Sequence, residues 1–197
     1  MKILTKFIPT EIGYDGTQLT AHWIYRNFDI LGNAVVSFVG PCDVKLQEMV
    51  DLEDVKTRSP IYSRSMLHFI GEFFDLDLEK TVYRQRLFMA LLKDILEKQI
   101  LQKQVLQKKT SQKQFIRRGD DIYDKDFKLT VSIATLSPIS TLMHVGINII
   151  SDGTPVPTKG LTDYGLSAEI LANELLEIFK IELESSWLAR CKVREAN

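Results

Sequence analysis

Apolar residues recur with two different spacings along this chain of 197 residues, and the spacing separates the expected helices from the expected strands. Repeats of three and four residues run from about 80 to 109 and from about 167 to 185, which predicts a long helix and a C-terminal helix. Alternation marks 114–118, 127–136 and 141–150, which predicts three strands. The last two strands are separated by the short turn SPIS and should form a hairpin.

Before residue 76 the pattern is less regular. We expect a strand over 2–8 and, after the turn GYDG, a helix over 17–32. A strand over 33–44 should end at its Gly-Pro pair, and SMLHFIGEFFD at 65–75 indicates a short amphipathic helix. This mixed order, with several hairpins, favours an α+β fold whose mostly antiparallel sheet is flanked by helices. No boundary divides the chain, so a single domain over 1–197 is expected.

Composition and charge narrow the classes of function. A hydrophobic content of 45% is ordinary for a soluble globular protein, and a net charge of −1 argues against a protein built chiefly to hold nucleic acid. The chain shows no signal peptide and no run of about 18 apolar residues, so a cytoplasmic setting without a membrane partner is expected. Cys42 and Cys191 lack metal-ligand spacing, and no metal site is expected.

The segment from Lys98 to Arg118 carries several basic residues and no acidic one. A solvated helix end, rich in Gln and Lys, explains this run. A surface for phosphate or for an acidic partner is the alternative. The long helix or a sheet edge could also support a homodimer, although the sequence fixes no stoichiometry.

The two strands of the expected hairpin share a side made of small and polar residues. A turn centred near Ile139 would pair positions whose numbers sum to about 278, which places these residues together. Small side chains let a ligand or another backbone approach closely, so this side is either a ligand-binding surface or a plain solvent face. The residues on it are Thr130, Ser132, Ala134, His144, Gly146 and Asn148.

The stretch RRGDDIYD at 117–124 gathers charges of both signs. Arg117 or Arg118 could clamp a phosphate or a carboxylate, but neighbours on a strand point to opposite faces, so at most one should reach a given ligand. Asp120 and Asp121 could bind Mg²⁺ together with nucleotide phosphates. Alternatively, they form an acidic turn.

Other signatures of catalysis are weak. His68 lies among apolar neighbours, where a satisfied, partly buried histidine is the default interpretation and a catalytic role is the alternative. No Ser-His-Asp or Cys-His spacing can be defended, and the chain has no Walker loop and no GxGxxG motif.

Two sequence stretches resemble a known family. GDDIYDKDFKLTVSIA followed by HVGINII resembles the core of the biotin protein ligases, in which Asn-Asp leads to Lys-x-x-Gly and the next strand carries Gly-x-Gly-x-Asn. Lipoate ligases share that fold and its lysine. The whole chain, with YDGTQLTAHWIYRNFDILG, GPCDV and MVDLEDV, resembles a prokaryotic family called domain of unknown function 366, which is placed in the fold of the class II synthetases and the biotin and lipoate ligases.

The resemblance implies roles for individual residues. Lys128 matches the lysine that bridges the substrate carboxylate and the adenylate phosphate, and Asp121, or its neighbour Asp120, matches the aspartate of Asn-Asp. Gly146 and Asn148 match the strand beside the ligand. The implied function is an ATP-dependent ligase or acyltransferase, working with Mg²⁺, that activates a small carboxylate. A non-catalytic protein that senses a nucleotide or small carboxylate, or works with a partner protein, is the alternative.

The chain also departs from the biotin ligases. Their glycine- and arginine-rich loop has no counterpart here, where the region reads GPCDVKLQEMVDLEDV. Val131 replaces the glycine of Lys-x-x-Gly and His144 replaces a small residue, which counts against biotin as the ligand. In this fold the first helix borders the pocket, so His22 and Arg26, one helical turn apart, either meet a ligand acid or form an exposed polar face.

Overall fold

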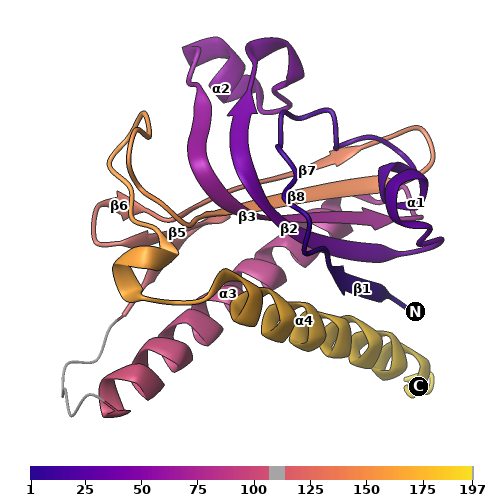
Figure 1. Cartoon of the computed structure of the whole chain (residues 1–197). Helices are drawn as coiled ribbons and strands as arrows, with labels where there is room; N and C mark the ends of the chain where they lie inside the picture. The colour runs from indigo at the N-terminus through magenta and orange to yellow at the C-terminus, as the bar shows by residue number, and fades with distance from the viewer. Residues whose placement is uncertain (107–113, 197) are drawn as a thin grey trace.

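The main sheet has five strands in the order β1-β2-β3-β8-β7 (Figure 1). β1 pairs with β2 in parallel, and the other neighbours pair antiparallel. The expected α+β fold with a mostly antiparallel sheet is confirmed in this computed structural model, which describes residues 1–106 and 114–196. The strands of the main sheet are β1 (Leu4–Phe7), β2 (Ala34–Val44), β3 (Ile61–Phe73), β7 (Thr130–Leu136) and β8 (Thr141–Asn148).

Both long helices lie on one face of this sheet, below it in Figure 1. They are α3 (Leu78–Leu106) and α4 (Ala168–Cys191), which confirms the two expected helices, with the second running on beyond residue 185. Residues 107–109 of the expected long helix lie outside the described residues. No helix in the described ranges is both long and apolar enough to span a bilayer.

The remaining elements are small and surround the other face and one end of the main sheet (Figure 1). A second sheet has three strands in the order β4-β5-β6. Its first strand confirms the expected strand at 114–118. These elements are α1 (Trp23–Phe28), η1 (Leu46–Glu48), α2 (Leu52–Thr57), β4 (Ile116–Arg118), β5 (Asp121–Asp124), β6 (Phe127–Lys128) and η2 (Leu161–Tyr164).

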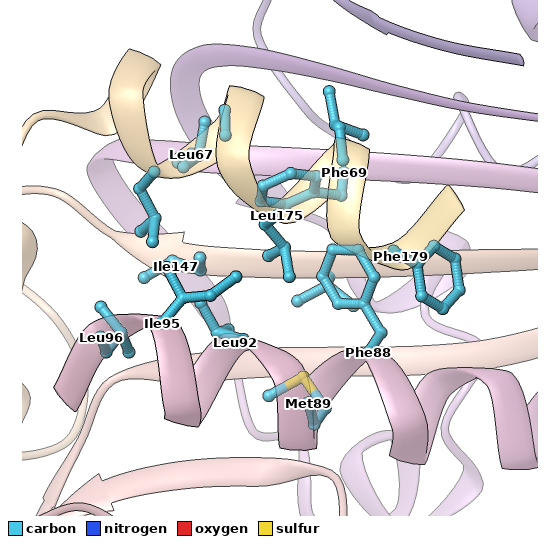
Figure 2. Packing of buried hydrophobic residues seen from close by; sticks show 14 of the residues in the cluster. Leu67, Phe69, Phe88, Met89, Leu92, Ile95, Leu96, Ile147, Leu175 and Phe179 are labelled. Carbon is cyan, nitrogen blue, oxygen red and sulfur yellow. The ribbon is translucent and has the colours of Figure 1, made fainter. Parts of the chain in front are cut away.

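The larger hydrophobic core fills the space between the sheet and the two long helices (Figure 2). Phe88 of α3 lies at its centre, with ring centroids 5.0 Å from Phe69 of β3 and 4.9 Å from Phe179 of α4, both in edge-to-face geometry. Edge-to-face packing of aromatic rings adds to the free energy gained by burying their area. The core therefore ties the helices to the strands that carry the candidate site on their other face.

A second core covers the opposite face of β2 and β3. Ile24, Phe38, Met66 and Ile70 are buried there, under α1 and the loops that flank it. β3 is consequently buried on both faces and reads as a nearly continuous apolar run. The expectation of a helix over 65–75 is therefore wrong, because periodicity alone cannot separate such a strand from a helix.

Two further expectations near the N-terminus are corrected. The helix expected over 17–32 is reduced to α1, which begins after His22 in the left-handed backbone region with φ of 61°. The strand expected to end at Gly-Pro continues through it to Val44, with a shift in register between Gly40 and Cys42. A Cβ on Gly40 would lie 1.9 Å from the carbonyl oxygen of Ile12, so the close approach of these two segments requires glycine.

The hairpin of β7 and β8 forms as expected but in a different register. Val131 pairs with Gly146 and Ser132 pairs with Val145, because the turn is closed by a hydrogen bond from Ser137 N to Ser140 O of 2.8 Å. Directly paired residues share a face, and a slip of one residue moves a strand's side chains to the other face. The expected common polar face is therefore wrong.

Each face of this hairpin consequently carries both apolar and polar residues. Thr130 and Ser132 are paired with Ile147 and Val145 of the larger core, on the side of α3. Three positions of β8 that were expected on the same face as Thr130 and Ser132 lie on the opposite face instead. They are His144, Gly146 and Asn148.

The basic segment has a structural role where it is described. Lys98 Nζ lies 2.7 Å from Glu174 Oε1, and Lys103 Nζ donates to the carbonyl oxygen of Gly165 at 2.7 Å. These contacts tie the end of α3 to α4 and to the loop before it. Residues 107–113 of the segment lie outside the described residues.

Candidate functional site

Two cavities adjoin at Lys128, on the side of the main sheet away from α3 and α4. The inner cavity has a volume of about 260 Å³ and the outer cavity about 390 Å³. Lys128, Asp54, Ile61 and Val131 line both. The inner cavity is further lined by Tyr14, Leu19, Val44, Glu48, Met49, Val50, Asp51, Glu53, Asp120, Asp121, Ser132, Ile133 and His144. The outer cavity is further lined by Tyr62, Met66, Tyr123, Thr130, Asn148, Pro155 and Pro157.

Lys128 ends β6, and its backbone is held on both sides. Its N–H donates to the carbonyl oxygen of Pro157 at 3.0 Å, and its own carbonyl oxygen accepts from Lys159 N at 3.2 Å. Its Nζ lies 2.7 Å from Asp121 Oδ2, and the two side chains are 30% and 17% exposed. The expected pairing of this lysine with an aspartate of the RRGDDIYD stretch is thus present, through Asp121.

The charges of this pair influence each other. Burial raises the pKa of the Asp121 carboxyl above its ordinary value, and the ammonium of Lys128 offsets part of that effect. Burial alone would lower the pKa of Lys128, but the Asp121 carboxylate outweighs it and the pKa is raised. Lys128 is therefore a firmly protonated cation at the junction of the two cavities.

Thr130 holds Asp121 by a hydrogen bond, and the neighbouring Asp120 is held by side chains outside the pair. Thr130 Oγ1 donates to Asp121 Oδ1 at 3.2 Å and accepts from Ile122 N at 2.8 Å. The Asp120 carboxylate accepts from Gln85 Nε2 at 3.3 Å, while Ser132 Oγ donates to the Asp120 carbonyl oxygen at 2.7 Å. Thr130 and Ser132 thus have their hydroxyl groups engaged with the acidic stretch.

Four residues expected to bind a ligand lie outside the cavities: Arg117, Arg118, His22 and Arg26. Arg117 Nη1 donates to the carbonyl oxygen of Gly119, and the Arg118 guanidinium lies 4.9 Å from the ring centre of Tyr123. Arg26 Nη1 donates to the carbonyl oxygen of Ala21 at 2.9 Å. None of Arg117, Arg118, His22 and Arg26 lines either cavity in the described structure.

Gly146 also lies outside both linings. A Cβ at this position would lie 2.3 Å from Met66 Sδ and 3.1 Å from Val131 Cγ2. The missing side chain is therefore explained by the packing of Met66 across β8, and the expected approach of a ligand at Gly146 is not supported.

His68 and His144 form a buried pair beneath the inner cavity. His68 Nε2 lies 3.2 Å from the carbonyl oxygen of Gly40, which can only accept, so Nε2 carries the proton and His68 Nδ1 is an acceptor. His144 Nε2, 3.1 Å from His68 Nδ1, must then be the donor. His144 Nδ1 is left with a lone pair and makes no hydrogen bond to any described residue.

Burial keeps both rings neutral. It lowers the pKa of His68 to about 4 and, together with the neighbouring His68, holds the pKa of His144 well below its usual range. Tyr14 stacks on His144 with ring centroids 3.8 Å apart. His68 is therefore a satisfied buried histidine, and His144 presents a fixed acceptor next to the inner cavity.

The acidic wall of the inner cavity was not expected from the sequence. Glu48, Asp51, Glu53 and Asp54 line it, all from the segment that replaces the glycine- and arginine-rich loop. Asp51 caps α2 by accepting from the backbone N–H groups of Glu53 and Asp54. Burial, followed by repulsion from Asp51, raises the pKa of Asp54. The only sequence signal was the density of acids in DVKLQEMVDLED.

Asn148 is the polar residue of the outer cavity whose hydrogen bonding is incomplete. It is 4% exposed, and its Oδ1 has no partner among the described residues. Buried polar atoms are normally paired, so this oxygen is an exception. The oxygen atom itself is buried, so the Asn148 side chain would have to turn before the oxygen could accept from a ligand in the cavity.

Comparison with known proteins agrees with this fold. The chain is 34% identical to a protein of unknown function from Pyrococcus horikoshi, with full coverage of both chains and a TM-score of 0.87. It is similar to a lipoate-protein ligase A bound with ATP, at 15% identity, a TM-score of 0.50 and coverage of 93% and 86%. It is similar to the biotin protein ligase from Aquifex aeolicus in complex with biotin and ATP, at 10% identity, a TM-score of 0.54 and coverage of 93% and 70%.

The two ligases share the fold with this chain, whereas the Pyrococcus protein is a relative in sequence as well. A family match covers nearly the full length, over residues 3–194, and extends through every helix and strand described above. The chain belongs to the family described as domain of unknown function (DUF366).

Proposed function

We propose that this chain is an ATP-dependent enzyme that activates a small carboxylate as its acyl adenylate. The observation that carries the proposal is the position of Lys128, which lines both cavities. An adenylating site must bring the carboxylate of one substrate to the α-phosphate of another. A protonated lysine where two cavities adjoin is placed to attract both anions and to neutralise the charge that develops between them.

The outer cavity suits the nucleotide. Tyr62 and Tyr123 offer apolar ring surface, and the side-chain amide of Asn148, once turned toward the cavity, would offer an acceptor for an amino group of a base. The lipoate-protein ligase and the biotin protein ligase of the same fold were each solved with ATP, which supports a nucleotide site in this architecture.

The proposed reaction needs no covalent protein intermediate. A carboxylate oxygen attacks the α-phosphorus of ATP, the bond from that phosphorus to the bridging oxygen of pyrophosphate breaks, and acyl adenylate and pyrophosphate are formed. An acceptor nucleophile then attacks the acyl carbon and AMP leaves. Lys128 contributes charge neutralisation and positioning in both steps.

The described residues supply no preformed cage for a metal ion. No group of three His, Cys, Asp or Glu side chains in that part of the chain is arranged to hold one. Asp121 is engaged with Lys128, and Asp120 is engaged with Gln85 and Arg86. Mg²⁺ therefore fits this site only as a companion of the nucleotide phosphates, held by few protein ligands.

A second candidate is a non-catalytic protein that binds a nucleotide or small carboxylate as a signal. The observation that favours it is the absence of an arginine from the linings of both cavities in the described residues. Such a protein would bind its ligand without forming pyrophosphate.

Thermal-shift titration and pyrophosphate exchange together separate the candidates. The protein is titrated with ATP–Mg²⁺ and AMP, alone and with biotin, lipoate or octanoate. Binding to the native state raises its stability by about 2.7 kcal/mol at a ligand concentration of one hundred times Kd, which is readily detected. Exchange of labelled pyrophosphate into ATP that depends on a carboxylate would support the enzyme.

Variants sharpen that experiment. Lys128→Ala should lose exchange while it keeps the fold. Lys45→Ala is the matched control, because it removes a lysine that pairs with Asp43 at 2.6 Å outside both cavities. A nucleotide shift without any exchange would favour the signal-binding candidate. No shift with any nucleotide would refute the enzyme, and no shift with any nucleotide or carboxylate would refute both candidates.

A further inference from the structure

The charge of the inner cavity does not match a plain fatty acid. Glu48, Glu53 and Asp54 line it, and no lysine or arginine of the described residues lies within ion-pair distance of any of them. Lys128, the one cation in the lining, is already paired with Asp121. A ligand whose only charge is a carboxylate would therefore meet more repulsion than attraction along this wall.

A second observation is independent of the acids. His144 is 3% exposed and lines the inner cavity, and its hydrogen bond to His68 leaves Nδ1 as an acceptor. A neutral imidazole with a fixed acceptor nitrogen favours a ligand group that donates a hydrogen bond. Tyr14 stacks on the ring and keeps it in this orientation.

The remaining lining limits the size and shape of the ligand. Leu19, Val44, Val131 and Ile133 add apolar surface to the lining of this cavity of about 260 Å³. This volume suits a short chain with polar groups at its ends. A metal ion does not explain the acids, because the described residues hold no group of three ligands for one.

We propose that the inner cavity selects a small carboxylic acid that also carries a protonated amino group. This inference rests on the proposed function and names its substrate class. The carboxylate meets Lys128, the aliphatic part lies on Val131 and Ile133, and the ammonium group is held by Asp54 and Glu48. Asp54 lines both cavities with Lys128, so the two ends of the ligand are bound by opposite charges across the junction.

The electrostatic coupling of the two side chains agrees with this arrangement. Lys128 acts to lower the pKa of Asp54, and Asp54 in turn acts to raise the pKa of Lys128. An ammonium group beside Asp54 would relieve the unfavourable burial of that carboxylate, which otherwise raises its pKa.

Matched pairs of ligands test the proposal. Hexanoate is compared with 6-aminohexanoate, and pentanoate with 5-aminopentanoate, by thermal shift at pH 7 with and without ATP–Mg²⁺. The amino compound of each pair should bind on the order of tenfold more tightly, as expected for one charge-assisted hydrogen bond. The same compounds are then used in pyrophosphate exchange.

Variants of the acidic lining residues test whether these residues cause the preference for the amino compound. Asp54→Asn should abolish the preference by weakening the binding of the amino compound, whereas hexanoate should bind at least as tightly as before because one repulsive carboxylate is removed. The variant should fold because burial opposes the charge at this position. Asp43→Asn removes an acid of the same segment that lies outside both linings and should keep the preference. Glu48→Gln provides a second position on the wall.

The outcomes distinguish the inference from the proposed function. A preference for the amino compound that Asp54→Asn removes would support the inference. Exchange driven by hexanoate at least as well as by 6-aminohexanoate would overturn it and leave the proposed function standing. A preference that survives both Asp54→Asn and Glu48→Gln would also overturn it. A protein that responds to no nucleotide and no carboxylate would overturn both.

Discussion

Lys128 Nζ and Asp121 Oδ2 lie 2.7 Å apart between the end of β6 and the start of β5, where the inner and outer cavities adjoin. The pair is half-sheltered from water, and Thr130 holds the second carboxylate oxygen of Asp121. A buried charge that loses its partner destabilises a protein more than an intact pair stabilises it. This asymmetry makes the pair accessible to stability measurements without any knowledge of the ligand.

Replacing the lysine of this pair should destabilise the fold in a pH-dependent way. Lys128→Met leaves Asp121 as an uncompensated buried carboxylate and should cost about 1–3 kcal/mol at pH 7. Because burial raises the folded-state pKa of Asp121, the folded variant binds a proton more readily than the unfolded chain, and its stability should recover as the pH falls through that pKa. Urea denaturation between pH 4 and 8 measures this recovery.

Lys45→Met is the control for that variant, because the pair of Lys45 and Asp43 is exposed. It should change the free energy of unfolding by less than about 0.5 kcal/mol at any pH in this range. Equal losses in the two variants would contradict the account of Lys128.

The buried histidine pair should make the protein acid-sensitive. Burial lowers the folded-state pKa of His68 to about 4, so below pH 6.5 the unfolded chain takes up a proton that the folded chain does not. Stability is therefore full above pH 6.5 and falls towards pH 4, with a loss from His68 of about 2 kcal/mol at pH 5. His68→Phe should remove the His68 share of this dependence between pH 5 and 7, measured by chemical denaturation, and the share of His144 should remain. A dependence unchanged by His68→Phe would contradict this account.

Asn148→Leu should separate stability from nucleotide binding. Its buried Oδ1 has no hydrogen-bond partner among the described residues, so an apolar residue of similar volume should leave the melting temperature unchanged or raise it. The shift on adding ATP should be lost, because the acceptor in the outer cavity is gone. Ser37→Ala removes another unpaired buried oxygen outside both cavities and should keep the nucleotide shift.

Gly146→Ala tests whether this glycine serves packing. The added methyl group would meet Met66 Sδ and Val131 Cγ2, which should cost about 1–3 kcal/mol. In a Met66→Ala background the same substitution should cost clearly less, because the two positions share one space. Additive costs of the two substitutions in urea denaturation would refute this explanation.

The sequence predicts best those elements that are amphipathic. α3 and α4 each bury one stripe, so their apolar residues recur with helical spacing and both helices could be located. β3 is covered on both faces, and the residues from Met66 to Phe73 are all buried, so nothing in that run distinguishes a strand from a helix. α1 is short because tertiary contacts override the local preference for helix: the Glu72 side chain accepts from the backbone N–H of His22, whose backbone is left-handed.

The candidate site divides in the same way. Lys128 and Asp121 could be predicted from a resemblance carried by a short motif, and the structure brings them together. The faces of the β7–β8 hairpin could not be predicted, because a shift of one residue in the strand register moves side chains to the opposite face. The register is set by the hydrogen-bonded turn between Ser137 and Ser140. The acidic wall escaped prediction because Glu48 and Asp54 lie in two short helices, η1 and α2, of the β2–β3 connection, which are too short to show a period in the sequence.

The backbone hydrogen bonds of Lys128 to Pro157 and Lys159 have a mechanical consequence. The loop that contains Pro155 and Pro157 forms one wall of the outer cavity, and it is also the segment to which the lysine is fastened. A ligand that displaces this loop should therefore also displace Lys128, which lines the inner cavity as well. We therefore expect insertions or deletions in this loop to disturb both cavities at once, because its backbone is bonded to Lys128, which lines both.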